Sequence, residues 1–86
     1  ETSTHIYIRM VVADRTGVLA QIAEAFARNN VSIDSVIQRK LENGRAELVI
    51  LTDKVLNEDM ERAKDEISSL EVVMEIKSVL RSEKED

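Results

Sequence analysis

The residues best suited to bind a ligand lie in one short segment, Asp14-Arg15-Thr16-Gly17-Val18-Leu19. The segment follows alternating apolar residues and precedes apolar residues at helical spacing, so it ends a strand and opens a helix. The first N–H groups of a helix have no acceptor within it, and they lie at the positive end of its dipole. Because Gly17 has no side chain, this corner can accept the carboxylate of a small ligand, while Asp14 or an Asn from elsewhere holds its ammonium group. The alternative is that Asp14 or Thr16 only caps the helix and Gly17 only permits the turn.

The rest of the sequence predicts no catalytic and no metal site. His5 is the only imidazole, the chain has no Cys, and no motif joins a nucleophile to a base. Its two glycines lie too far apart for a phosphate-binding loop. The acidic residues of the second predicted helix are expected to be solvated surface groups, namely Glu58, Asp59, Glu61, Asp65 and Glu66.

The composition indicates one domain of a cytoplasmic protein. The 86 residues are 43% hydrophobic and 34% charged, with a net charge of −5. An aromatic content of 2% and the acidic balance argue against nucleic acid as a partner. The apolar runs are far too short for a membrane-spanning helix, so no membrane partner is expected. A chain that begins at Glu1 rather than Met is expected to be part of a longer one.

The periodicity of apolar residues predicts four strands, at 5–12, 31–41, 46–52 and 72–80. The Asn43-Gly44 pair between the second and third strands favours a type I′ hairpin turn. In these two strands apolar residues point to both faces of the sheet, which suggests contact with a second subunit or a missing domain. The alternative is that they are scattered surface aliphatics without significance.

The spacing of apolar residues also predicts two helices. The first runs from Val18 to about Asn30, where Asn is a stop signal because it tolerates the left-handed conformation. The second is a charged helix with a narrow apolar stripe and has Asn57 or Asp53 as its N-cap. That stripe consists of Leu56, Met60, Ala63, Ile67 and Leu70.

This order of elements predicts an α+β, ferredoxin-like βαββαβ fold. Right-handed crossovers put both helices on one face of a four-stranded antiparallel sheet, in the strand order fourth-first-third-second. Residues 1–5 are expected to be a linker from a missing upstream domain, residues 6–81 the folded domain, and residues 82–86 a disordered charged tail.

Several segments make the chain similar to a known family. Asp14 to Ala20, Ile22-Ala23 and Asn30-Val31-Ser32-Ile33 resemble the signature of ACT domains, the small regulatory modules of amino-acid metabolism. The likeness covers nearly the whole chain, from Ile6 to Arg81. Within that family, Ser32 to Gln38, Ala46 to Val49 and Ser78 to Arg81 resemble the C-terminal ACT domains of homoserine dehydrogenases, which are NAD(P)-dependent oxidoreductases.

The resemblance implies the same fold, a missing Rossmann-type catalytic domain that uses NAD(P), and a role in threonine feedback. No cofactor and no catalysis are expected of this chain itself. The resemblance also implies a dimer formed side by side through the second strand and the first helix, with a small amino acid such as L-threonine between the copies. Carried over by position, the effector-binding residues are Asp14, Thr16, Gly17, Val18 and Leu19 of one copy and Asn30, Val31, Ser32 and Ile33 of the other.

One residue departs from the family pattern, because Thr16 stands where a Pro is usual before the Gly. The loop is then less rigid, or the Thr16 hydroxyl caps the helix. Two alternative functions stay open. One is a purely structural dimerisation module without an effector. The other is the ACT domain of a different protein, such as a stringent-response synthetase or the small subunit of acetolactate synthase.

Overall fold

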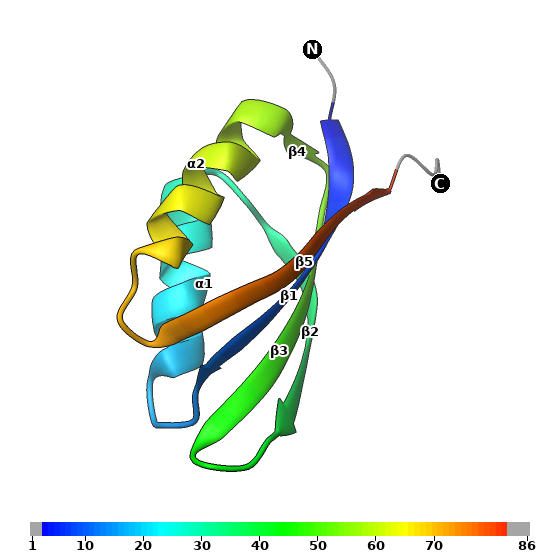
Figure 1. Ribbon diagram of the computed structural model, residues 1–86. Coiled ribbons are helices and arrows are strands. Elements are labelled where there is room, and N and C mark those ends of the chain that lie inside the picture. Colours follow the sequence, from blue (N-terminus) through cyan, green and yellow to red (C-terminus); the bar gives the residue numbers. More distant parts are fainter. Residues whose placement is uncertain (1–2, 83–86) are drawn as a thin grey trace.

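An antiparallel sheet carries both helices on one face in the computed structural model, which describes residues 3–82 (Figure 1). The α+β, ferredoxin-like fold expected from the sequence is confirmed. Neither helix among the described residues is long and apolar enough to cross a membrane. The elements in chain order are β1 (Ser3–Ala13), α1 (Val18–Arg28), β2 (Ile33–Lys40), β3 (Arg45–Thr52), β4 (Val55–Leu56), α2 (Asn57–Ser68) and β5 (Val73–Ser82).

The sheet has the predicted order with one addition. It runs β2-β3-β1, and β5, the last predicted strand, pairs antiparallel with β1. The addition is β4, a two-residue strand that pairs with the start of β1, placing Leu56 opposite Ser3 and Val55 opposite Thr4. Because β2 pairs only with β3, it is an edge strand whose outer backbone groups are open.

Some element boundaries differ from those expected. β1 begins at Ser3, so residues 3–5 are strand where a linker was expected, and β5 extends through Ser82. Residues 1–2 of the predicted linker and residues 83–86 of the predicted tail lie outside the described part of the chain. The predicted cap of α2 is wrong. Leu56 holds the N-cap position without a side-chain hydrogen bond, because the short strand β4 leads directly into the helix.

The core lies between the helices and the inner face of the sheet. Alternation in β1 buries Ile6, Ile8, Met10 and Val12, which are at most 1% exposed. From α1 the core receives Val18, Ile22, Ala25 and Phe26, and from α2 it receives Met60, Ala63 and Ile67. The hairpin after β2 closes with Asn43 and Gly44 both at positive φ, 63° and 70°, as the Asn-Gly pair predicts.

The outer face of the sheet is both apolar and charged. Tyr7 lies opposite Leu51 on one side and Leu80 on the other, and Ile37 on the edge strand is 66% exposed. Beside these residues, Glu47 contacts Arg39 at 2.9 Å and Arg9 at 3.6 Å. The hydrogen bond from Arg39 holds the pKa of Glu47 below its usual range. Apolar residues therefore do occupy both faces, and their role in a contact stays a prediction.

Candidate functional site

The corner between β1 and α1 is fixed to the β2–β3 hairpin through Asp14. The Asp14 backbone N–H donates to the carbonyl oxygen of Gly44 at 2.9 Å. Its carboxylate oxygen Oδ2 accepts a hydrogen bond from Lys40 Nζ, also at 2.9 Å. The carboxylate that the sequence assigns to a ligand's ammonium group is therefore already paired, with a lysine whose side chain is 83% exposed.

The N-terminus of α1 carries no side-chain cap. Gly17 is the N-cap residue, with φ 89° and ψ −6°, and no side chain of the described residues bonds to the helix end. The capping role considered for Asp14 or Thr16 is therefore wrong. Within residues 3–82, the N–H groups of Gly17, Leu19 and Ala20 have no acceptor. These groups form a set of open donors at the positive end of the helix dipole.

Gly17 is required at this corner by its backbone conformation. A φ of 89° lies in the left-handed region, which glycine adopts without strain. A Cβ placed on Gly17 would meet no atom within 4 Å outside its two chain neighbours, so no other residue within 3–82 covers this side of the glycine. The corner is therefore accessible to a small anionic group.

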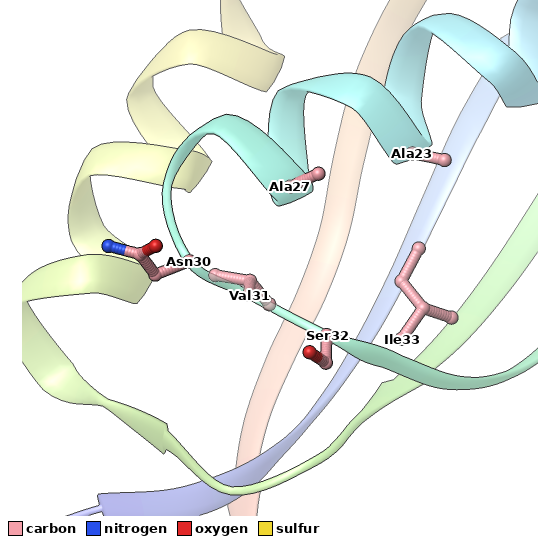
Figure 2. Close-up of a pocket in the computed structure, with 6 residues that line it drawn as sticks. All are labelled: Ala23, Ala27, Asn30, Val31, Ser32 and Ile33. Carbon is pink, nitrogen blue, oxygen red and sulfur yellow. The ribbon is translucent and has the colours of Figure 1, made fainter.

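The opposite end of α1 borders a pocket of about 590 Å³. Asn29 is the C-cap residue, Asn30 follows with φ 64°, and the Val31 N–H donates to the Phe26 carbonyl oxygen at 2.9 Å. In Figure 2 the Asn30 side chain points away from the other lining residues. The lining residues are Ala23, Ala27, Asn30, Val31, Ser32 and Ile33.

One copy of the chain does not bring the nine predicted effector-binding residues together. The residues from Asp14 to Leu19 lie at the start of α1, and those from Asn30 to Ile33 follow its end. The helix has 11 residues, which corresponds to a length of about 16 Å. Val18 and Val31 are 5% and 3% exposed, so their side chains belong to the core and only their backbones can face a ligand. A site that uses both groups needs two copies.

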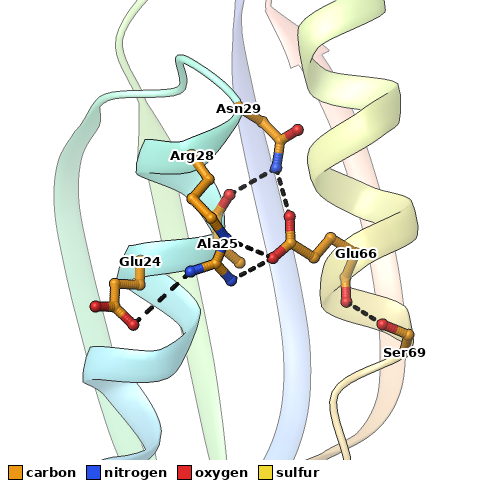
Figure 3. Close-up of polar contacts among 6 residues, drawn as sticks. All are labelled: Glu24, Ala25, Arg28, Asn29, Glu66 and Ser69. Carbon is orange, nitrogen blue, oxygen red and sulfur yellow. Dashed lines mark hydrogen bonds and ion pairs between the residues drawn. The ribbon is translucent and has the colours of Figure 1, made fainter.

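A polar cluster near the pocket was not anticipated from the sequence. Glu66 Oε2 accepts from Arg28 Nε at 2.8 Å and also pairs with Arg28 Nη2, while Glu66 Oε1 accepts from Asn29 Nδ2 at 2.9 Å (Figure 3). The hydrogen bond from Arg28, followed by that from Asn29, holds the pKa of Glu66 below its usual range. The same contact raises the pKa of Arg28.

The expectation that all five acidic residues of α2 are solvated is wrong at two positions. Glu66 is half-buried in the cluster with α1, and Asp59 is only 9% exposed and pairs with Arg62. Both residues flank the buried stripe of α2, where the neighbouring structure displaces water. A spacing of seven residues puts them on one side of the helix, and this was the signal available in the sequence. The other three acidic residues, Glu58, Glu61 and Asp65, are exposed.

Comparison with known proteins gives consistent matches along the chain. The ACT domain family profile matches residues 6–72. The homoserine dehydrogenase of Synechocystis sp. is 40% identical over 78 residues, which cover 91% of this chain and 18% of that protein. The crystal structure of a homoserine dehydrogenase from Thiobacillus denitrificans matches with a TM-score of 0.76 and 30% identity, over 93% of this chain and 17% of that one.

A third match concerns the fold alone. The ACT domain of GTP pyrophosphokinase from Chlorobium tepidum has a TM-score of 0.68 at 17% identity, over 94% of this chain and all of that one. The chain thus spans about a fifth of the length of the homoserine dehydrogenases that it matches, at 18 to 19% for the first two relatives.

Proposed function

The chain belongs to the ACT domain family, and from this we propose that it is the regulatory domain of a homoserine dehydrogenase that responds to threonine. In this proposal the catalytic, NAD(P)-dependent domain is a separate part of a longer cytoplasmic protein. The present chain binds no cofactor and carries out no chemistry. The identity to the Synechocystis enzyme supports this parent over the stringent-response alternative, because the likeness to the ACT domain of GTP pyrophosphokinase is limited to the fold.

The observation that carries the ligand part of the proposal is the uncapped start of α1. The open N–H groups around Gly17 suit the carboxylate of a zwitterionic amino acid. The ammonium group needs oxygen acceptors, which Asp14 and the Asn30–Ile33 segment offer. Since these lie at opposite ends of α1, the proposed site combines the corner of one copy with the Asn30–Ile33 segment of the other. Threonine binding and dimerisation would then strengthen each other by the same factor.

The free edge of β2 supports the proposed side-by-side dimer. The chain contains no Pro to block pairing at this edge, and Ile37 on it is 66% exposed. A two-fold arrangement would let β2 pair with its copy and place α1 beside its copy in the opposite direction. The start of each α1 would then approach the end of the other.

A second function, assembly without an effector, is favoured by one specific observation. Asp14 already has a partner in Lys40, and the edge of β2 serves dimerisation whether or not a ligand binds. Calorimetry and sedimentation separate the two functions. We expect L-threonine to bind with a dissociation constant of roughly micromolar to millimolar, and the chain to sediment as a dimer. A dimer that gives no heat with millimolar threonine, isoleucine, methionine or serine would favour the assembly module, and a monomer that binds nothing would oppose both.

A further inference from the structure

The carboxylate of Glu66 binds two consecutive residues at the end of α1. One oxygen accepts from Arg28, the last residue of the helix, and the other accepts from Asn29, its C-cap (Figure 3). Among the hydrogen bonds and ion pairs within residues 3–82, these are the side-chain links between α1 and α2. The end of α1 that borders the pocket is thus the end that α2 holds.

Asn29 links Glu66 to the backbone segment that lines the pocket after α1. Its Nδ2 group donates one hydrogen to Glu66 and the other to the Ala25 carbonyl oxygen, at 2.9 Å and 2.8 Å. With both hydrogens used, the side chain is fixed against the last turn of α1. The next residue, Asn30, has the left-handed φ of 64°, after which Val31 bonds back to Phe26. The Asn29 side chain therefore acts together with the backbone hydrogen bonds of Asn30 and Val31 to hold the turn at which the chain leaves the helix.

Glu66 is itself held in place. Its backbone carbonyl oxygen accepts from the Ser69 hydroxyl at 2.7 Å and from the Ser69 N–H at 3.1 Å, which fixes the last turn of α2. Its side chain is only 31% exposed, whereas the other carboxylate near Arg28, that of Glu24, is 77% exposed and 3.9 Å away. Glu66 thus provides a fixed anchor for the turn, and Glu24 does not.

We propose that Glu66 is a positioning residue for the amino-acid site, which it shapes through Asn29 without touching the ligand. This inference rests on the proposed function, because it assigns the Asn30–Ile33 wall of the pocket to the effector. Without the carboxylate, Asn29 loses one of its two acceptors and the turn samples other exits from the helix. The wall of the pocket is then less ordered, and the entropy lost in ordering it on binding weakens the affinity for threonine.

The test compares three variants of the chain: Glu66→Ala, Glu66→Gln and the control Glu24→Ala. We expect Glu66→Ala to accelerate amide hydrogen exchange at Val31 and to weaken L-threonine binding by roughly 2- to 30-fold, the range for substitutions that act through an intervening residue. Glu24→Ala should change neither. Glu66→Gln keeps an acceptor for Asn29 but loses the ion pair with Arg28. It should therefore show the same amide hydrogen exchange at Val31 and the same threonine affinity as the unsubstituted chain, but a lower thermal stability.

The outcomes distinguish this inference from the proposed function. If affinity follows thermal stability across the three variants, Glu66 is merely structural and the positioning role is overturned. The same holds if Glu66→Ala leaves Val31 exchange and threonine affinity unchanged. If the unsubstituted chain binds no threonine, the proposed function fails first, and Val31 exchange alone then decides whether Glu66 holds the turn.

Discussion

The two ends of α1 are built in opposite ways. At its start, Gly17 leaves N–H donors without acceptors, and no side chain within residues 3–82 closes the helix. At its end, Arg28 and Asn29 bond to Glu66, and Val31 bonds back to Phe26. One end has open backbone donors and the other is fixed in shape. The two ends do not differ in hydrophobic burial, since Val18 and Val31 are buried almost equally, at 5% and 3% exposure.

This difference suits the two roles that we propose for α1 in an amino-acid site. An open set of backbone donors can exchange water for a carboxylate without breaking a protein hydrogen bond. A fixed wall loses little entropy when a ligand packs against it. If the end of α1 were as open as its start, the turn after it would lose entropy each time a ligand bound. If the start were capped like the end, it would offer no free N–H donors.

The largest expected effects should be equal at the two ends. Truncating either buried valine, as Val18→Ala or Val31→Ala, should lower the free energy of unfolding by about 1 to 3 kcal/mol, because each removes two methyl groups from the core. Urea denaturation measures both. If the losses in free energy of unfolding of the two variants differ by more than about 2 kcal/mol, then core packing, and not polar contact alone, distinguishes the two ends of α1.

A smaller effect is expected from strain at the open end. Gly17→Ala should lower the free energy of unfolding by about 1 to 2 kcal/mol, because alanine resists a φ of 89°. Gly44→Ala is the matched control, with a φ of 70° in the hairpin. Both variants should be destabilised alike, whereas only Gly17→Ala should weaken threonine binding in calorimetry. Equal weakening by both would show that the corner has no special role.

Acidification should weaken the fixed end. The pKa of Glu66 is lower in the folded chain than the ordinary value of 4.5, so its contribution to stability is complete above that pH and is lost as the pH falls through the lowered value. Thermal melts between pH 6 and pH 3 should show this loss, with a shallower decline for Glu66→Gln. The pKa of Glu47 is lowered by Arg39 in the same way, so part of the decline in thermal stability with falling pH should remain in Glu66→Gln. An unchanged slope in the variant would contradict the assigned contact.

The smallest effect is expected at the ion pair of the open end. Lys40→Ala should change the free energy of unfolding by less than about 1 kcal/mol, because this lysine is exposed and its pair with Asp14 is screened by solvent. The variant should nevertheless bind threonine at least as tightly as the unsubstituted chain, since it leaves Asp14 available to the ammonium group. Weaker binding would mean that Lys40, rather than Asp14, faces the ligand.

The sequence predicted the elements and their order better than it predicted the contacts between them. Alternation in β1 and the helical spacing of Ile22 and Phe26 are local patterns that follow directly from the geometry of strands and helices. The short strand β4 was missed, because a two-residue pairing leaves no periodicity. Its presence also explains why the predicted cap of α2 failed.

The candidate site was only partly predictable for the same reason. The open corner could be read from Gly17 and the change of period around it. The partnership of Glu66 with Arg28 and Asn29 joins residues 37 and 38 positions apart and depends on how the two helices lie together. The pairing of Asp14 with Lys40 likewise depends on the hairpin reaching the corner.

We expect one amino-acid site to be made from opposite ends of α1 in two copies, and a mixture of two defective variants can test this arrangement. Gly17→Val damages the open corner, and Ser32→Tyr obstructs the pocket at the fixed end. Neither variant should bind L-threonine alone. After random exchange of subunits in an equal mixture, each mixed dimer has one intact site, so calorimetry should recover about one quarter of the unsubstituted binding capacity. No recovery in a mixture shown to contain mixed dimers, or full binding by either variant alone, would mean that the site is not shared between two copies.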